Sequence, residues 1–350
     1  MTRLTAWFAL LLTAAAQGAP LTVRFFDVGQ GDAALVTTPL GKTVLIDGGP
    51  PDAGPRLTSR VRALTQGPLD LVVLSHAHLD HLGGLTDVLR AVGARRYLEP
   101  DFDHPSTAYL SFLRFLGTLE VTKLPTGDPT QPLVPVRYPL EPEVELTLLW
   151  PRVDGEGKPL EPFLGNTRSD VNANSVVARL TYRKTSFLFV GDAEADTEAL
   201  LVKKNLPLAS TVLKVAHHGS RHSSTASFLE KVKPTAAVIS CAAKNDYGHP
   251  AAETLVRLSA AGAKVYRTDL HGEVTALSDG EVVRLRTERA GVVPASPTST
   301  QGPYVASKRS QVFHLASCAA VATIKPHNRL EFSERTAAAK ERRPAGDCRP

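Results

Sequence analysis

The run Ser75-His76-Ala77-His78-Leu79-Asp80-His81-Leu82-Gly83-Gly84 is the most informative part of this 350-residue sequence. It follows segment 69–74, whose β-branched and leucine side chains predict a buried strand. The polar run therefore begins where a strand ends and is expected to form a loop. Three imidazoles and a carboxylate within six residues favour Zn²⁺ or Mn²⁺ over Ca²⁺ or Mg²⁺. His76 and His78 would project to the same side and bind one ion, leaving Asp80 and His81 for a neighbouring ion.

Matching side chains follow two other predicted strands. Asp192 comes directly after segment 186–190, where its carboxylate could bridge two ions, and His217 follows segment 211–216. Two divalent cations held together stabilise the attacking and leaving oxygens of a phosphoryl group and ionise a water between them. The predicted ligands of this two-metal site are His76, His78, Asp80, His81, Asp192 and His217.

Three residues are predicted to take part in catalysis, namely Asp80, His218 and His249. His218 would donate a proton or bind phosphate beside the metals, and the alternative is a packed imidazole that supports its neighbours. His249 would donate a hydrogen bond to a non-bridging phosphate oxygen, and the alternative is a histidine that holds its own loop. Asp32 and Asp47 are expected to orient the ligating histidines.

The remaining pattern predicts a mixed α/β or α+β domain. Apolar, partly alternating segments predict strands, and amphipathic segments predict helices between them. The expected strands are 21–28, 33–37, 43–46, 69–74, 144–150, 175–181, 186–190, 211–216, 236–240, 264–267, 272–277 and 282–287, and the expected helices are 56–66, 85–92, 194–202 and 252–261.

The N-terminus is expected to be a signal peptide, residues 1–19. Arg3 is the only charge before an apolar stretch from Ala6 to Ala16, and small residues follow it. The alternative is a buried N-terminal helix. The signal would make the mature chain secreted or periplasmic, and we expect no membrane span in the mature chain.

A Pro/Ser/Thr-rich stretch, 289–302, is expected to link a hydrolase domain (20–288) to a small basic domain (303–350). The small domain holds nine basic and four acidic side chains, a balance equal to the net charge of +5 of the whole chain. Such a tail suits a polyanion such as DNA, and the alternative is a solvated tail without a ligand. Cys318 and Cys348 lie in this unit and either form a disulfide or belong to a metal site, whereas Cys241 is expected to be a buried thiol.

These motifs together resemble the metallo-β-lactamase superfamily, and most closely the extracellular domain of ComEC-type competence proteins. The resemblance covers roughly residues 21–287. The C-terminal unit resembles the small metal-binding domain of Ada-type DNA repair proteins, although the first cysteine of that family's Cys-x-x-Cys pair is Ala345 here. The motifs that carry the main resemblance occur in the family's order: 26–33 (FDVGQGDA), 45–49 (LIDGG), 75–84 (SHAHLDHLGG), 174–175 (NS), 191–192 (GD), 217–220 (HHGS) and 247–250 (YGHP).

The resemblance implies an αββα sandwich with two Zn²⁺ or Mn²⁺ ions at one edge. It also implies a nuclease that degrades one DNA strand while a transmembrane channel imports the other, so the expected partners are DNA and a membrane channel. Superfamily members usually supply one more histidine to the first metal. No histidine lies between His104 and His217, so water, Asn172 or Asn174 would have to complete that site.

Three functions remain open from the sequence. The first is a secreted, metal-dependent nuclease or phosphodiesterase. The second is a small-ester hydrolase of the same fold, such as a phosphorylcholine esterase, a lactonase or a β-lactamase-like enzyme. The third is a non-catalytic DNA-binding protein that has lost one metal. The intact run from His76 to His81 disfavours the third.

Overall fold

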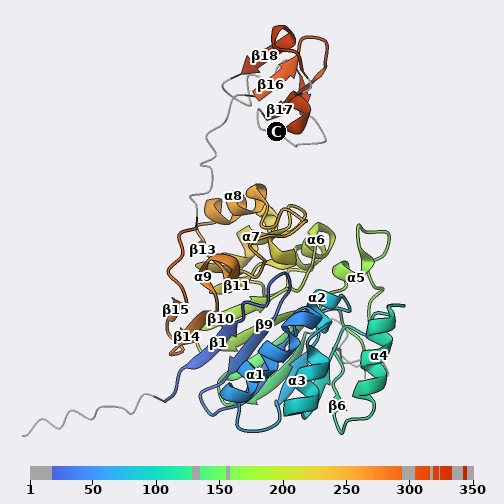
Figure 1. Cartoon of the computed structure of the whole chain (residues 1–350), viewed down its shortest axis with the longest axis vertical. Coiled ribbons are helices and arrows are strands. Elements are labelled where there is room, and N and C mark those ends of the chain that lie inside the picture. The colour runs from blue at the N-terminus through green and yellow to red at the C-terminus, as the bar shows by residue number, and fades with distance from the viewer. Residues whose placement is uncertain are drawn as a thin grey trace, which may run out of the picture. The chain divides into compact units, whose positions relative to one another are not determined.

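The chain divides into two units, residues 1–293 and 294–350. The computed structural model (Figure 1) describes residues 18–127, 135–154, 158–293, 304–315, 318–322, 324–332 and 342–344. Residues 1–17 of the expected signal peptide and 294–302 of the expected linker lie outside the described ranges. None of the helices in these ranges is long and apolar enough to cross a membrane.

The first unit contains two mixed β-sheets. The first sheet has eight strands in the order β15-β14-β1-β2-β3-β4-β5-β6, and the second has seven in the order β13-β12-β11-β10-β9-β8-β7. The strands of the first sheet are β1 (Leu21–Phe25), β2 (Ala34–Thr37), β3 (Thr43–Ile46), β4 (Leu71–Val73), β5 (Arg96–Leu98), β6 (Thr122–Lys123), β14 (Val274–Ser278) and β15 (Val283–Thr287). Those of the second are β7 (Val136–Glu141), β8 (Val144–Trp150), β9 (Val177–Tyr182), β10 (Thr185–Phe189), β11 (Val212–Lys214), β12 (Ala236–Ile239) and β13 (Lys264–Arg267).

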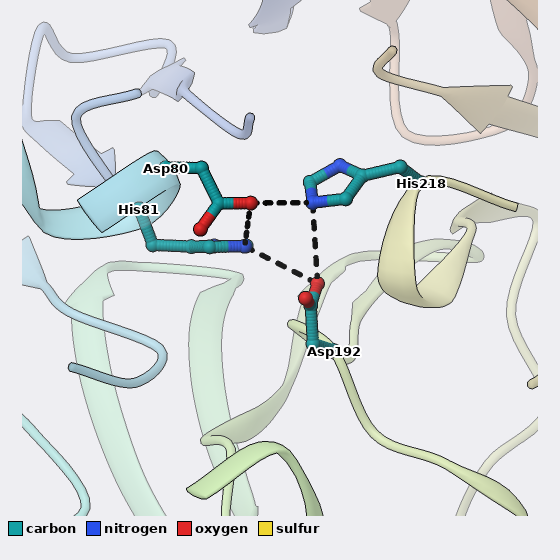
Figure 2. A group of neighbouring side chains, drawn as sticks. All are labelled: Asp80, His81, Asp192 and His218. Carbon is teal, nitrogen blue, oxygen red and sulfur yellow. Dashed lines mark hydrogen bonds and ion pairs between the residues drawn. The ribbon is translucent and has the colours of Figure 1, made fainter. Parts of the chain in front are cut away.

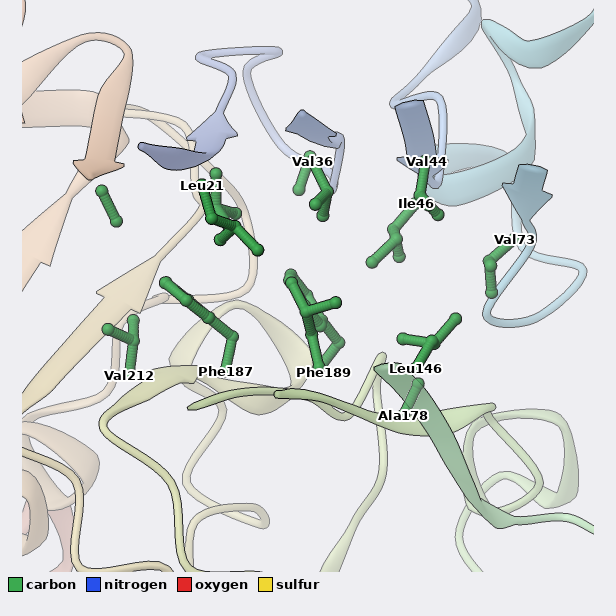
Figure 3. Close-up of a cluster of buried hydrophobic side chains, with 14 of the residues drawn as sticks. Leu21, Val36, Val44, Ile46, Val73, Leu146, Ala178, Phe187, Phe189 and Val212 are labelled. Carbon is green, nitrogen blue, oxygen red and sulfur yellow. The ribbon is translucent and has the colours of Figure 1, made fainter. Parts of the chain in front are cut away.

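The two sheets face each other across one apolar core (Figure 3). Val23 and Ile46 of the first sheet and Phe187 and Phe189 of the second belong to this core. Alternate side chains of a strand point to opposite faces of its sheet. On the other face, Leu45 of the first sheet and Leu213 of the second are also buried, so this face of each sheet needs a covering layer.

Helices supply those outer layers, which confirms the predicted αββα sandwich. Leu57 and Val88, on helices before and after the histidine-rich loop, pack with Leu45 against the outer face of the first sheet. Phe228 and Leu258 pack with Leu213 against that of the second. The helices are α1 (Gly54–Leu64), α2 (Leu79–Leu82), α3 (Leu85–Val92), α4 (Thr107–Leu116), α5 (Asp170–Ala173), α6 (Ala195–Lys203), α7 (Ala226–Val232), α8 (Ala252–Ala260) and α9 (Thr268–His271), with 3₁₀ turns at Pro51–Ala53 and Ala216–Gly219.

Most predicted strands and helices occur within a few residues of their expected bounds, and the bounds of Thr43–Ile46, Leu85–Val92, Val144–Trp150 and Lys264–Arg267 are the predicted ones. Helices α2, α4, α5 and α9 and strands β5, β6 and β7 were not predicted. Strand β7 contains Pro139 and has exposed or half-exposed residues along most of its length. It lies at the edge of the second sheet, where proline is tolerated and the usual apolar signal is weak.

The second unit has a small sheet in the order β18-β16-β17-β19. Its core is formed by Tyr304, Ala306 and Phe313. The Sγ atom of Cys318 lies 3.7 Å from Nδ1 of His314, whereas Cys348 lies outside the described residues. Both the Ada-like assignment and the cysteine pairing therefore stay predictions. The elements are β16 (Tyr304–Ser307), β17 (Val312–Leu315), α10 (Ala319–Ala322), a 3₁₀ turn (Pro326–Asn328), β18 (Arg329–Phe332) and β19 (Arg343–Pro344).

Candidate metal centre

The loop after β4 brings its histidines together, as predicted. Nε2 of His76 lies 3.0 Å from Nδ1 of His78. His78 is the residue before α2, and Asp80 and His81 lie in the first turn of this helix. The ring centre of His81 lies 4.2 Å from that of His76, so the histidines of the loop and of the helical turn adjoin one another. His76 and His81 are completely buried.

Four side chains from both halves of the sandwich form a tight cluster (Figure 2). Asp80, His81, Asp192 and His218 each offer an atom, and these atoms all lie within 4.8 Å of one another. Nε2 of His218 lies 3.0 Å from Oδ2 of Asp80. Nε2 of His81 lies 3.2 Å from Oδ1 of Asp192. The cluster thus joins the loop after β4 to the ends of β10 and β11.

Asp192 belongs to this cluster and also faces His76 and His217. Its Oδ1 atom faces His81 and His218, at 3.2 and 3.7 Å from their Nε2 atoms. Its Oδ2 atom faces His76 and His217, at 3.8 and 3.6 Å from their Nε2 atoms. One carboxylate therefore presents one oxygen to each group of imidazoles, which is the arrangement expected of a bridging ligand.

His217 and His218 adopt an unusual backbone conformation, with φ values of 49° and 53°. Such left-handed residues cost free energy and persist only where surrounding contacts impose them. The backbone N–H of His217 donates to the carbonyl of Gly191, the residue before Asp192. The strained turn therefore sends two consecutive imidazoles into the same site, where an extended chain would separate them.

The two histidines take different positions within the site. His218 is buried and belongs to the four-residue cluster, whereas the His217 side chain is 22% exposed. Nδ1 of His217 lies 3.2 Å from a carboxylate oxygen of Glu194, a partner that the sequence analysis missed. Glu194 follows Asp192 by two positions. Residues two apart in an extended segment point to the same side, so this spacing could have indicated that Glu194 belongs to the site.

Asp47 and Asp32 lie beside the Nδ1 atoms of His81 and His218, respectively. Asp47 Oδ2 lies 2.8 Å from Nδ1 of His81, and its Oδ1 accepts the N–H of Ser75. Nδ1 of His218 donates to the backbone carbonyl of Ser240 at 3.0 Å, and Asp32 Oδ1 lies 3.3 Å from the same nitrogen. An acceptor on the remote ring nitrogen fixes the tautomer of a metal-binding imidazole. Asp47 and the Ser240 carbonyl are placed for this orienting role, and Asp32 adds its charge beside His218.

Burial and charge shift the pKa values of this cluster in opposite directions. Burial alone would lower the pKa of the His218 ring, but Asp192 and Asp32 outweigh it and raise this pKa to about 10. Burial also opposes the charge on His81, yet the same kind of carboxylate neighbours raise its pKa well above the usual value. Burial would raise the pKa of Asp192, but His81 and His218 lower it well below its usual range. In the metal-free protein, protons on imidazoles therefore balance the carboxylates, and a bound cation would release them.

The donor set fits divalent zinc or manganese. Among the described residues, Nε2 of His81 and Oδ1 of Asp192 are buried polar atoms without a hydrogen-bond partner. Unpaired buried polar atoms are costly, and a cation would satisfy both. Imidazole nitrogens with carboxylate oxygens are ligands that both metals accept.

A cavity of about 450 Å³ opens beside these residues. Its lining includes His78, Asp80, Asp192, His217, His218 and His249, so the predicted ligands and catalytic residues surround one space or lie against it. The lining also includes His104, whose ring centre is 5.8 Å from that of His78. The fold thus brings His104 to the site, although it is not among the ligands predicted from the sequence.

Asn172 and Asn174 differ in their availability to a metal. The Asn174 side chain is fully used, since its oxygen accepts the N–H of Leu164 and its amide donates to the carbonyls of Leu164 and Asp170. Asn172 lines the cavity, and its buried Oδ1 has no hydrogen-bond partner. Of the two, Asn172 is the one whose oxygen is free to bind a cation.

Comparison with known proteins agrees with this architecture. The chain is 31% identical over 261 residues to Competence protein ComA of Neisseria gonorrhoeae, covering 71% of this chain and 31% of that protein. It is 26% identical over 272 residues to ComE operon protein 3 of Bacillus subtilis, covering 72% of this chain and 32% of that protein. It is also 27% identical over 256 residues to Recombination protein 2 of Haemophilus influenzae, with coverage of 72% and 28%.

These relatives are ComEC-type competence proteins, so the predicted resemblance is confirmed. The chain spans about a third of the length of these curated relatives. The model of the metallo-beta-lactamase superfamily matches residues 26–243, which include the histidine-rich loop, Asp192 and His218. With this match over more than half of its length, the chain belongs to the metallo-beta-lactamase superfamily.

Proposed function

We propose that this metal-dependent hydrolase is a phosphodiesterase, and specifically a secreted or periplasmic nuclease that acts on DNA. The observation that carries the proposal is the position of Asp192, whose two oxygens face separate groups of imidazoles. A site with one shared carboxylate suits two cations. Two cations suit a phosphodiester, because its attacking and leaving oxygens both carry negative charge in the transition state.

The geometry favours a specific division of the ligands. His76 and His78 with Oδ2 of Asp192 would hold the first ion, and Asn172 or His104 would complete its ligand set. Asp80, His81 and His218 with Oδ1 of Asp192 would hold the second ion. This assigns His218 to the second ion, because its Nε2 atom belongs to the cluster. Nε2 of His217 lies 3.6 Å from Oδ2 of Asp192, so His217 would join the ligands of the first ion. The bound Zn²⁺ or Mn²⁺ ions would supply electrostatic stabilisation and a nucleophilic water at neutral pH.

His249 would then serve the substrate. Burial, then His218 and His217, lower the pKa of His249 to about 4. A neutral His249 would donate a hydrogen bond to a phosphate oxygen, as the sequence analysis expected, without carrying charge.

Two further observations support DNA as the substrate. The matched relatives are competence proteins. The C-terminal residues carry the excess positive charge, and basic side chains attract phosphates. A membrane channel for DNA uptake is the further partner that the resemblance to competence proteins implies.

The proposal is tested with protein from residue 20 onward on single- and double-stranded DNA, with zinc, manganese or chelator. We expect metal-dependent cleavage and about two metal ions per chain by elemental analysis. Asp192→Asn should lower the rate by more than about 100-fold and reduce bound metal, because even the partner of a ligand is worth 10–100-fold. Asp52→Asn, at an exposed position outside the cavity lining, is the matched control. Bound metal without DNA cleavage would overturn the nuclease and favour a small-ester hydrolase, to be tested on phosphorylcholine esters, lactones and β-lactams.

A further inference from the structure

Tyr247 is an exposed aromatic side chain in the wall of the metal cavity. Its exposed fraction is 70%, and it belongs to the residues that line the cavity. A large aromatic surface in water costs free energy unless a ligand or partner covers it. The metal ligands are buried or half-buried, so Tyr247 is the part of the lining most open to an approaching substrate.

The loop that carries Tyr247 is held by the side chain of Asn245. The Oδ1 atom of Asn245 accepts the backbone N–H groups of Tyr247 and His249, at 3.2 and 2.9 Å. Its Nδ2 atom donates to the carbonyls of Ala242 and His249, at 3.0 and 2.7 Å. These bonds fix the backbone on both sides of the tyrosine. A ligand that meets the ring would therefore lose little binding free energy to ordering of the loop.

The ring of Tyr247 lies next to His249, one of the proposed catalytic residues. It stacks on His249, with ring centres 5.6 Å apart and planes inclined by 22°. The ring centre of His249 is in turn 6.2 Å from that of His218 and 5.4 Å from that of His217. A row of parallel or tilted rings thus leads from the four-residue cluster to the exposed tyrosine.

We propose that Tyr247 is a stacking subsite for the nucleobase next to the phosphodiester that the enzyme cleaves. This inference rests on the proposed nuclease function and adds how the base is held. Stacking on an aromatic ring suits every base, because each base has a π-face. The subsite would therefore give affinity for nucleotides over phosphodiesters without rings, with little preference among sequences.

The subsite is tested by removing the ring and the base in turn. A thymidine oligonucleotide and an abasic oligonucleotide of the same length are compared as substrates of the metal-loaded wild type, Tyr247→Ala and Tyr247→Phe. Base–aromatic stacking is worth about 1–3 kcal/mol, so the wild type should prefer the thymidine substrate by about tenfold in kcat/KM. Tyr247→Ala should slow cleavage of the thymidine substrate about tenfold more than cleavage of the abasic substrate and so lose this preference, whereas Tyr247→Phe should keep it.

Two controls separate this subsite from other roles of the ring. Leu40→Ala removes a side chain of similar exposure (73%) that is not part of the cavity lining, and it should keep the wild-type preference. If Tyr247 only supported His249, Tyr247→Ala would slow both substrates equally, which would overturn the subsite. Equal cleavage of both substrates by the wild type would also overturn it and leave the nuclease intact. Cleavage of neither substrate would overturn the proposed function and the subsite together.

Discussion

The ammonium nitrogen of Lys214 lies 2.6 Å from a carboxylate oxygen of Asp32, and both side chains are almost completely buried. Lys214 ends β11 in the second sheet, whereas Asp32 precedes β2 in the first. The ion pair therefore ties together the two halves of the sandwich that supply the candidate metal ligands. Burial would raise the pKa of Asp32, but Lys214 and then His218 outweigh it and lower this pKa to about 2.

Removing one member of this ion pair should destabilise the fold. Breaking a buried pair leaves an uncompensated charge and costs about 3–5 kcal/mol, so Lys214→Met should lower the free energy of unfolding by that amount. Lys214→Met combined with Asp32→Asn should cost less than the sum of the single changes. Urea denaturation of the chelator-treated protein measures these values. Lys184→Met, which breaks an exposed pair with Glu281, should cost less than about 1 kcal/mol. Strict additivity of the two buried changes would show that the pair is not coupled.

Asp47→Asn should weaken metal binding by about 10–100-fold, because Asp47 fixes the ring of His81 through its Nδ1 atom. Asparagine tolerates the left-handed backbone of this residue (φ 60°), so the fold should be kept. Competition with a chromophoric chelator measures the affinity. Asp70→Asn is the control, since Asp70 is a buried carboxylate that binds Lys42 and the N–H of Thr43 instead of a histidine. An unchanged affinity in Asp47→Asn would contradict the orienting role.

The metal-free protein should lose stability as the pH rises above neutrality. The pKa of His218 is raised to about 10, so its stabilising contribution is complete below the unfolded value of about 6.5. That contribution is lost as the pH rises through 10, because the native state then holds more protons than the unfolded state. His81 acts in the same direction.

This pH dependence is measured by denaturant unfolding between pH 6.5 and 10 in chelator. His218→Gln should flatten the slope, whereas His222→Gln, at a histidine outside the cluster, should leave it unchanged. A wild-type slope of zero or of the opposite sign would rule out protonated imidazoles in the metal-free site.

Gly31→Ala should disturb the metal site through the backbone. A Cβ atom at Gly31 would lie 2.3 Å from the carbonyl oxygen of Asp80, and the φ of +152° is one that L-residues rarely adopt. The loop carrying Asp80 would have to move, so metal affinity and melting temperature should both fall. A Cβ atom at Gly67 meets nothing within 4 Å, and Gly67→Ala should change stability by less than about 0.5 kcal/mol. Equal behaviour of the two variants would contradict the close approach of Gly31 to Asp80.

The sequence by itself predicted the sandwich and most of the side chains that the structure brings into the candidate metal site. Local patterns were sufficient, because the histidine-rich loop is continuous in the chain and begins at a recognisable strand end. Asp192 was found for the same reason, since it directly follows β10. The order of the short motifs also led to the correct family. These features depend on spacing along the chain, which the sequence states directly.

Only the tertiary structure decided which side chains share a space. His217 and His218 are neighbours in sequence, and a left-handed turn, which no spacing rule foresees, directs His218 into the four-residue cluster. His104 and Tyr247 join the same cavity from distant loops. In the sequence, Lys214 has the pattern of an ordinary strand residue. Its ion pair with Asp32 forms only because β11 packs beside the loop that carries Asp32. Such contacts arise because two sheets pack against each other. That packing depends on many core residues from distant parts of the chain, and no single sequence motif identifies them.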